Sequence, residues 1–338
     1  MPKINSHILN VSRVSTPYAD PNKIRLHASE RDIPHSEILW NTFLHKLSSH
    51  DVTYYPNIDS AYDLLQEFAV INKDYLTLYD GSSNGIRNIF SVFVTPNSKV
   101  VTTNPSFPMY RVYADINRAT YVDVPYRNEV CPVSEIVEQI DSDVSVVILS
   151  NPSSPVGDVI SYESMMKILS RCQEYDVLLV IDEAYIEFST ATSFVDVAPT
   201  NENLIVLRTM SKACGSAGAR IGYSVSSNTN KDYLSRVRSM NEISGFSIKW
   251  LETMCVHKAT ISDYVSKVIK NREWLQAKFI INGHKVICSE TNFIHVSDLE
   301  LPSEFVYKTC KMPWSDVLYS RISIPANQVI IDLLPFFE

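Results

Sequence analysis

Residues 204–222 read LIVLRTMSKACGSAGARIG, an apolar run that passes into a polar loop. The apolar run predicts a buried strand, so Lys212 is expected on the loop at the end of that strand. A partly desolvated lysine loses its proton readily and can condense with an aldehyde. The hydroxyls of Thr209 and Ser211 and the guanidinium of Arg220 can hold a phosphate. These residues suit an aldehyde cofactor that carries a phosphate, although taken alone they also fit an ordinary solvated loop lysine.

Composition excludes several classes of protein. The 338 residues, 45% hydrophobic and 20% charged, are typical of a globular enzyme with a large domain and a smaller one. A net charge of -8 argues against a nucleic-acid or anionic-membrane binder, so any phosphate site must be local. Six scattered cysteines, without a CxxC pair or zinc spacing, predict reduced thiols in a cytoplasmic protein and no metal site. We expect neither a secretory signal nor a membrane span, because no apolar run approaches roughly 18 residues.

Three apolar runs, 145–149, 177–181 and 204–207, alternate with helix-like segments. This alternation predicts an α/β fold with a mainly parallel sheet between helices. Each run ends in a polar cluster: NPSSPVG at 151–157, DEAY at 182–185, and the lysine loop. Ligands of such sheets collect beyond the carboxyl ends of the strands, so the three clusters are expected to form one site.

Two earlier loops can contribute to the same site. The loop 80–85 opens a helix, and Ser82 and Ser83 there either bind a phosphate at the positive end of the helix dipole or form an ordinary capped turn. Phe107 follows a strand-like run at 99–102 and either stacks on a flat heteroaromatic ring or packs in the core. A nucleotide site has little support, because the chain has neither GxGxxG nor a Walker lysine.

Asp182 follows five apolar residues and is expected to be buried, where a carboxylate needs a cation. A protonated pyridine nitrogen would supply that cation, although a strand-end Asp can also cap the next helix. Tyr185 can bond the phenolic oxygen of such a ring, and Lys212 can also move a proton at the α-carbon of a substrate. Arg321, on a late strand of alternating pattern, is either a clamp for an α-carboxylate or a surface residue.

The chain ends differ from the middle. Beyond about residue 230 we expect an α+β unit with helices at 231–259 and 261–281, strands at 284–288, 292–296 and 321–324, and an apolar segment at 329–334. Near the N-terminus we expect a strand at 24–26, a helix from Ser36 and a helix capped by Asp59. The resulting prediction is a large domain at 46–230 and a small domain made of 1–45 and 231–338.

Taken in order, these motifs resemble the fold-type I aminotransferases, and most closely the histidinol-phosphate aminotransferase group. The resemblance extends from about residue 24 to residue 324, and DEAYIEF together with the lysine loop is its most specific part. The matching motifs are Gly81-Ser82-Ser83, PSFPMY (105–110), NPSSPVG (151–157), DEAYIEF (182–188), LRTMSKACGSAGARIGY (207–223), TNF (291–293) and RISI (321–324).

The resemblance implies an enzyme that depends on pyridoxal 5'-phosphate and works as a homodimer with shared active sites. It implies Lys212 as the Schiff-base lysine, Asp182 on the pyridine nitrogen and Tyr185 on the phenolic oxygen. The other cofactor-binding residues that it implies are Tyr55 from the other subunit, Ser82, Ser83, Phe107, Ser154, Thr209, Ser211 and Arg220. On the substrate side it implies Arg321 as the carboxylate clamp, together with Glu30.

Two departures from the family pattern matter. The family's NPNNPTG is NPSSPVG here, so Ser154 stands where an asparagine usually bonds the phenolic oxygen. The family's Asn-x-Asn-Glu-Asn-Pro survives only as HASER at 27–31, which retains Glu30. Because the cofactor anchors persist while substrate-side positions differ, we expect a substrate that diverges from that of the histidinol-phosphate enzymes.

Three functions are compatible with these residues. The first is an aminotransferase that moves an amino group between an amino acid or amine and a 2-oxo acid. The second is a decarboxylase, lyase or cyclase that uses the same cofactor on an amino acid. The third is a non-catalytic binding protein, against which the retention of Lys212, Asp182 and Arg220 argues.

Overall fold

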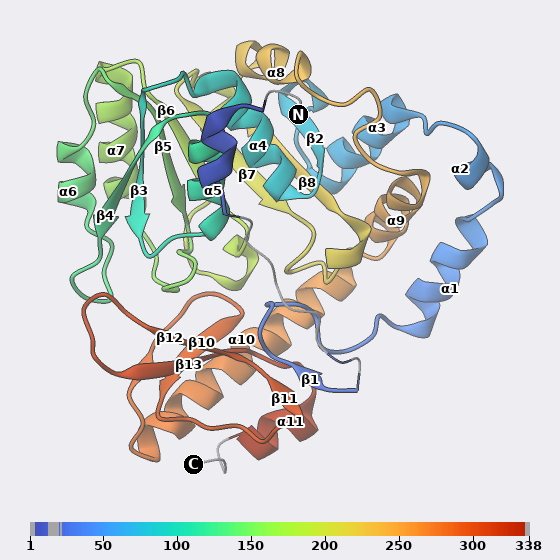
Figure 1. Ribbon diagram of the computed structural model, residues 1–338. Coiled ribbons are helices and arrows are strands. Elements are labelled where there is room, and N and C mark those ends of the chain that lie inside the picture. Colours follow the sequence, from blue (N-terminus) through green and yellow to red (C-terminus); the bar gives the residue numbers. More distant parts are fainter. Residues whose placement is uncertain (1–3, 13–19, 21, 335–338) are drawn as a thin grey trace.

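The computed structural model describes residues 4–12, 20 and 22–334, and a seven-stranded sheet forms its centre (Figure 1). Among these strands β8 is the one that runs antiparallel to its neighbours, so the predicted mainly parallel sheet is confirmed. The spatial order is β2 (Leu76–Asp80), β8 (Ile221–Ser226), β7 (Leu204–Thr209), β6 (Leu178–Asp182), β5 (Val144–Ser150), β3 (Lys99–Asn104) and β4 (Thr120–Pro125).

Helices cover both faces of this sheet, which is why its central strands are apolar along their whole length. Alternate residues of β6 enter two different clusters: Leu179 and Ile181 pack on one side, and Leu178 and Val180 on the other. The first side holds α3 (Ile58–Ala69), α6 (Val133–Glu138) and α7 (Tyr162–Glu174). The second side holds α4 (Ser82–Phe93), α5 (Pro108–Ile116) and α8 (Asn228–Ser235).

A smaller antiparallel sheet lies at one end of the molecule (Figure 1). Its order is β12 (Lys308–Lys311), β13 (Leu318–Ser323), β10 (Phe293–Ser297) and β9 (Val286–Ile287). The long helix α10 (Ala259–Ile281) packs against it, and α11 (Gln328–Leu333) follows it. Near the N-terminus, β1 (Ile24–Arg25) pairs in parallel with β11 (Phe305–Val306), so this segment joins the C-terminal unit as expected.

Two helix predictions were wrong in detail. The helix expected over 231–259 is two helices, because α8 ends at Ser235 and α9 (Gly245–Val256) begins only after a loop. The Ser244 side chain accepts a hydrogen bond from the Ser247 N–H at 3.2 Å and so starts α9 afresh. Asn57, rather than Asp59, caps α3 by accepting from the Ser60 N–H at 3.3 Å.

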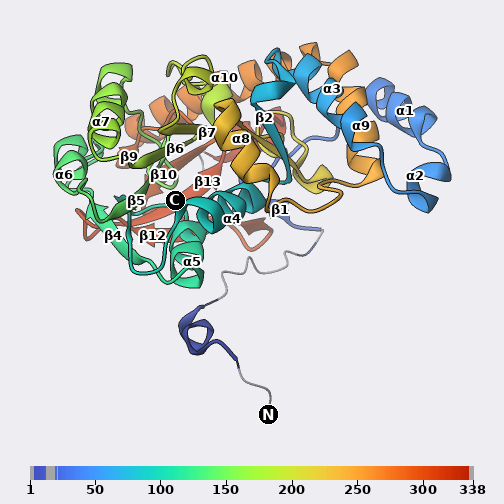
Figure 2. The ribbon, with the colours of Figure 1, turned by 90° about the horizontal axis from the view of Figure 1, so that it is seen from above.

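The packing of α9 bears on the predicted domain boundaries. Leu39 and Phe43 of α1 (Glu37–Lys46) share the core of the large sheet with Trp250 and Leu251 of α9. Figure 2 shows α1, α2 (His50–Thr53), α3 and α9 grouped at one end of the molecule. The two-domain division remains a prediction, and this packing favours junctions nearer residues 36 and 257 than residues 45 and 230.

The remaining elements are short. They are five 3-10 turns: η1 (Ser6–Asn10), η2 (Lys73–Tyr75), η3 (Ile186–Phe188), η4 (Ala198–Thr200) and η5 (Ala217–Ala219). Within the described ranges, none of the helices combines the length and the apolar character that crossing a membrane would require.

Candidate active site

The carboxyl ends of β5, β6 and β7 meet at one edge of the large sheet, where they border a cavity of about 210 Å³. Ser150 and Asp182, the last residues of β5 and β6, are directly paired in the sheet register. The ends of these strands and the loops after them together supply most of the cavity wall, as the doubly wound topology predicts. The lining residues are Ala28, Glu30, Ser82, Ser83, Phe107, Ser150, Ser154, Asp182, Ala184, Tyr185, Thr209, Ser211, Lys212, Ala217 and Arg220.

Asp182 is a buried carboxylate that lines this cavity. The Tyr110 hydroxyl donates to its Oδ2 at 2.8 Å, and the Ala184 N–H donates to its Oδ1 at 3.2 Å. Burial nevertheless raises the pKa of Asp182 to about 6, against these hydrogen bonds and the charge of Lys212. Tyr110 belongs to the PSFPMY motif, but the sequence did not predict its contact with Asp182, which depends on the tertiary structure.

Lys212 presents its amine to the same cavity. Its Nζ donates to the Ala28 carbonyl oxygen at 3.0 Å and lies 5.5 Å from the centroid of the Tyr185 ring. Burial is the largest influence on the Tyr185 hydroxyl and raises its pKa, but the charges of Lys212 and Arg321 and contacts with the Ser29 and Ser154 hydroxyls outweigh it. The pKa of Tyr185 therefore lies below its ordinary value, which favours stabilisation of a neighbouring oxyanion.

A site that could bind an anion, called here the anion cradle, lies where α4 begins and is formed by the first residues of α4 and by Arg220. Within the described residues no side chain caps α4, so the N–H groups of Ser82 and Ser83 in its first turn can face an anion. Arg220, in the left-handed region with φ of 51°, extends its guanidinium across Gly81. A Cβ on Gly81 would overlap that guanidinium, and a Cβ on Gly222 would overlap the Ser82 nitrogen. The two glycines therefore allow Arg220 and the start of α4 to approach each other closely.

The cavity wall also includes Phe107 and Ser154, as predicted. Phe107 stands immediately before α5, and its ring meets that of Tyr110 edge to face at 5.6 Å between centroids. The Ser154 N–H donates to the Ser150 hydroxyl at 3.0 Å, which holds the NPSSPVG loop against the end of β5.

An adjoining cavity of about 390 Å³ shares Ala28, Phe107, Ser154, Tyr185 and Lys212 with the first. Arg321 lies here rather than in the first cavity. Its Nη2 donates to the Ser29 hydroxyl at 3.0 Å, and its guanidinium carbon lies 3.8 Å from the centroid of the Phe293 ring.

Burial lowers the pKa of the Arg321 guanidinium, which makes no ion pair with a carboxylate in the described part of the chain. An anion that binds beside the Arg321 guanidinium would offset the cost of burying its positive charge.

Lys308 is a second cation of this cavity that the sequence did not reveal. It lies opposite Arg321 in the β12–β13 register, and His295 lies opposite Arg321 on the other side. The three side chains therefore project from one face of the small sheet. Partial burial and the charge of Arg321 lower the pKa of Lys308, while burial and Arg321 lower that of His295 to about 3. Because β12 is mostly exposed, no apolar alternation predicted it.

Two residues that were predicted to bind the cofactor or the substrate, Tyr55 and Glu30, are not positioned as the other predicted site residues are. Tyr55 contributes to neither cavity wall and is 84% exposed in the segment after α2. Glu30 lines the first cavity, but its carboxylate pairs with Arg25 at 2.8 Å. The roles of both remain predictions.

The residues that meet here fit a phosphorylated aldehyde with a cationic ring. A buried carboxylate of raised pKa, an amine and an anion cradle occupy separate parts of one cavity. Within the described residues, no group of three or more His, Cys, Asp or Glu side chains has an arrangement that could hold a metal ion.

The chain is similar to known proteins over most of its length. The family model described as aminotransferase class I and II matches residues 21–325. The histidinol-phosphate aminotransferase of Thermoanaerobacter pseudethanolicus is 31% identical over 295 residues, which cover 85% of this chain and 82% of the relative. That of Clostridium novyi is 31% identical over 281 residues, covering 80% and 77%.

A solved structure has the same fold. It is the histidinol-phosphate aminotransferase from Sinorhizobium meliloti in complex with pyridoxal-5'-phosphate, which superposes with a TM-score of 0.84 at 21% identity over 99% of this chain and 96% of that one. With the match over most of its length, the chain belongs to the class I and II aminotransferases, and the cofactor of its active site is pyridoxal 5'-phosphate.

Proposed function

We propose that this aminotransferase moves the amino group of a donor that carries an anionic group to a 2-oxo acid. The observation that carries the proposal is the partly buried Arg321, which has no carboxylate partner among the described residues and shares a cavity with Lys308 and Lys311. That cavity is lined by no Asp or Glu in the described part of the chain. A buried cation is stabilised by an anion that forms charge-assisted hydrogen bonds with it.

The relatives are named for histidinol phosphate, a donor that also ends in an anion. Residues 27–31 depart from the family pattern, and three of them, His27, Ala28 and Ser29, line the cavity that holds Arg321. For that reason we propose a donor of the same anionic class that differs from histidinol phosphate.

The geometry of the first cavity supports the cofactor roles that we propose. Lys212 would bind the aldehyde covalently, and Asp182 would pair with the pyridine nitrogen. Tyr185 and Ser154 would bond the phenolic oxygen, and Phe107 would lie against the ring. The groups that would hold the phosphate are Ser82, Ser83, Thr209, Ser211 and Arg220. When bound, pyridoxal phosphate stabilises negative charge at the substrate carbon that exchanges a proton.

The chain itself supplies proton transfer and orientation. Lys212 lies on the wall that the two cavities share, so its amine can take and return a proton at the substrate α-carbon. Arg321 would hold the anionic end of the donor and so fix which bond faces Lys212.

A half-reaction experiment tests this function. An anionic amino donor should convert the bound cofactor to its amino form, and a 2-oxo acid should reverse the change. Absence of conversion with every donor tried would favour a decarboxylase, lyase or cyclase instead.

Replacing Lys308 should weaken the enzyme selectively for anionic donors. Loss of a hydrogen bond to a charged group costs roughly 1.5–3 kcal/mol, so Lys308→Ala should lower kcat/KM for an anionic donor roughly 10- to 100-fold. For the uncharged analogue of that donor, kcat/KM should change little. Lys270→Ala, on an exposed position of α10, is the matched control. An equal loss for both donors would contradict the assignment.

Replacing Ser154 by asparagine should change the pH at which the absorbance of the bound cofactor titrates. Asparagine offers a longer donor toward the phenolic oxygen and stabilises its anionic form better than the serine hydroxyl does. The midpoint pH is therefore expected to fall in Ser154→Asn. An absorbance titration measures it, and a rise would refute this account of Ser154.

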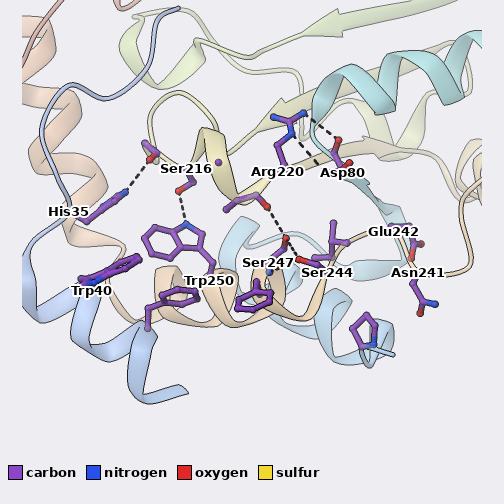
Figure 3. A pocket seen from close by; sticks show the side chains of 17 residues that line it. His35, Trp40, Asp80, Ser216, Arg220, Asn241, Glu242, Ser244, Ser247 and Trp250 are labelled. Atoms are coloured by element: carbon purple, nitrogen blue, oxygen red, sulfur yellow. Dashed lines mark hydrogen bonds and ion pairs between the residues drawn. The ribbon is translucent and has the colours of Figure 1, made fainter. Parts of the chain in front are cut away.

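We also propose that the enzyme is a homodimer with shared active sites. An apolar groove of about 750 Å³, lined in part by Trp40, Phe43, Phe246 and Trp250, lies beside Arg220, which also lines the cofactor cavity (Figure 3). Exposed apolar side chains lie on α1, on α2 and the segment after it, and on α9, and both α1 and α2 contact α9: Ile38, Trp40, Leu44, Val52, Tyr54, Tyr55 and Phe246. A second copy seated here would cover these side chains and would bring its own Tyr55 near the phosphate.

Sedimentation equilibrium should therefore give twice the mass of 38.3 kDa. Ile38→Asp should dissociate the pair and weaken cofactor binding, because a charge is expensive to bury in an apolar interface. A wild-type monomer that retains the cofactor fully would rule out shared sites.

Cytoplasmic location also remains a proposal. All six cysteines are free thiols, which is the usual state in a reducing compartment.

A further inference from the structure

One face of α9 touches the loop that joins Lys212 to Arg220. Ser247 and Trp250 lie three residues apart and so point to the same side of the helix. The Trp250 Nε1–H donates to the Ser216 hydroxyl oxygen at 2.8 Å, and the Ser247 hydroxyl donates to the Ala219 carbonyl oxygen at 2.8 Å (Figure 3). The helix therefore holds the loop at two points, one of them directly before Arg220.

Ser216 connects Trp250 to the turn that carries Lys212. Its hydroxyl donates to the Cys214 carbonyl oxygen at 2.9 Å, and its N–H donates to the Met210 carbonyl oxygen at 3.0 Å. The Gly215 N–H donates to the Lys212 carbonyl oxygen at 2.9 Å. These bonds close the turn on both sides of Lys212.

His35, whose ring contacts Trp250, also contacts this turn. Its Nε2 lies 3.1 Å from the Gly215 carbonyl oxygen, and because a carbonyl only accepts, the imidazole carries its proton on Nε2. Its ring meets Trp250 edge to face at 5.0 Å. Burial lowers the pKa of His35, so the ring is neutral and needs no counter-ion here.

We propose that Trp250 and Ser247 are positioning residues that set the separation between the Lys212 amine and the Arg220 guanidinium. The inference rests on the proposed function, in which these two cations hold the aldehyde and the phosphate of one cofactor. A rigid cofactor binds both ends only if the loop keeps them at the correct distance. Helix α9 keeps this distance through one hydrogen bond to Ser216 and one to Ala219.

The indole N–H of Trp250 can be removed with little loss of packing. Trp250 is buried against Phe43 and Trp40, with ring centroids at 5.1 and 6.4 Å, and phenylalanine would retain these apolar contacts. Trp250→Phe therefore isolates the hydrogen bond. Trp274→Phe, on α10 and partly exposed, is the matched control.

Hydrogen exchange in the cofactor-free protein tests the loop directly. In Trp250→Phe the amides of residues 212–220 should exchange roughly three- to tenfold faster, the effect of losing one buried hydrogen bond. Ser216→Ala removes the same acceptor together with the hydrogen bond from the Ser216 hydroxyl to the Cys214 carbonyl oxygen, so it should give at least as large an increase. The double variant should exchange no faster than Ser216→Ala alone, because the bond that Trp250→Phe removes is already absent there.

The loaded enzyme supplies a second measurement. Trp250→Phe should weaken cofactor binding roughly two- to tenfold and shift the pH midpoint of the cofactor absorbance, and Ser216→Thr should retain wild-type values because it keeps a hydroxyl. Exchange in Trp250→Phe that equals the Trp274→Phe control, or additive effects in the double variant, would overturn the proposal. The exchange measurement needs neither cofactor nor turnover, so its outcome is independent of whether the proposed amino transfer is correct.

Discussion

Replacing Lys212 by alanine is expected to abolish the absorbance band of the lysine-bound cofactor. It should also lower the amino-transfer rate at least 10²- to 10⁴-fold, the usual contribution of a positioned general acid or base. The cofactor should still bind, because the anion cradle at Arg220 and the Asp182 carboxylate are untouched. Absorbance spectra and single-turnover rates measure the two effects separately.

The matched control is Lys270→Ala, which removes an exposed lysine from α10. It should leave spectrum and rate at wild-type values. An unchanged absorbance band in Lys212→Ala would mean that another amine holds the cofactor, and the role given to Lys212 would have to be withdrawn.

Replacing Asp182 by asparagine is expected to have the second-largest effect. Loss of one partner of a buried ion pair costs roughly 3–5 kcal/mol, so the rate should fall roughly 10²- to 10⁴-fold. Asparagine keeps the size of the side chain and its place beside Tyr110 and Ala184, so the change tests charge rather than shape. A rate near that of the wild type would show that the ring nitrogen does not need the carboxylate.

In the cofactor-free protein, by contrast, Asp182→Asn is expected to be favourable, because it should increase the free energy of unfolding relative to the wild type as the pH rises. Burial raises the pKa of Asp182 from 3.8 to about 6, so the folded state holds the proton more tightly than the unfolded state does. The wild type should therefore lose on the order of 3 kcal/mol of unfolding free energy, relative to Asp182→Asn, as the pH rises from about 4 to above 6.

Urea unfolding of both proteins at several pH values measures this difference. With the cofactor bound, the wild type should instead be more stable than Asp182→Asn, because the cationic ring stabilises the carboxylate. A difference that stays constant with pH in the cofactor-free protein would show that Asp182 already has a cation partner.

The cofactor side of the site could be predicted from sequence because its residues directly follow strands. Apolar runs mark β5, β6 and β7, and Ser150, Asp182 and Thr209 end them. In a parallel sheet all such ends meet at one edge, so knowledge of the strands was sufficient to bring Asp182 and Lys212 together. The glycines at 81 and 222 belong to the same local patterns.

The substrate side depended on contacts between distant segments. Arg321 is held by Ser29, 292 residues earlier in the chain, and Lys308 reaches the cavity from a strand without an apolar pattern. The support of the lysine loop by α9 also escaped prediction, because the expected helix over 231–259 had no break before Gly245.

The sequence by itself determined the strands, the loops at their ends and the chemistry of the lysine, because hydrophobic period and turn residues act over a few positions. Only the tertiary structure decided that Lys308 stands beside Arg321, that Tyr110 bonds Asp182 and that α9 supports the loop between Lys212 and Arg220. Strand register and helix packing are set by the burial of the whole chain, and no local pattern encodes which distant side chains that burial brings together.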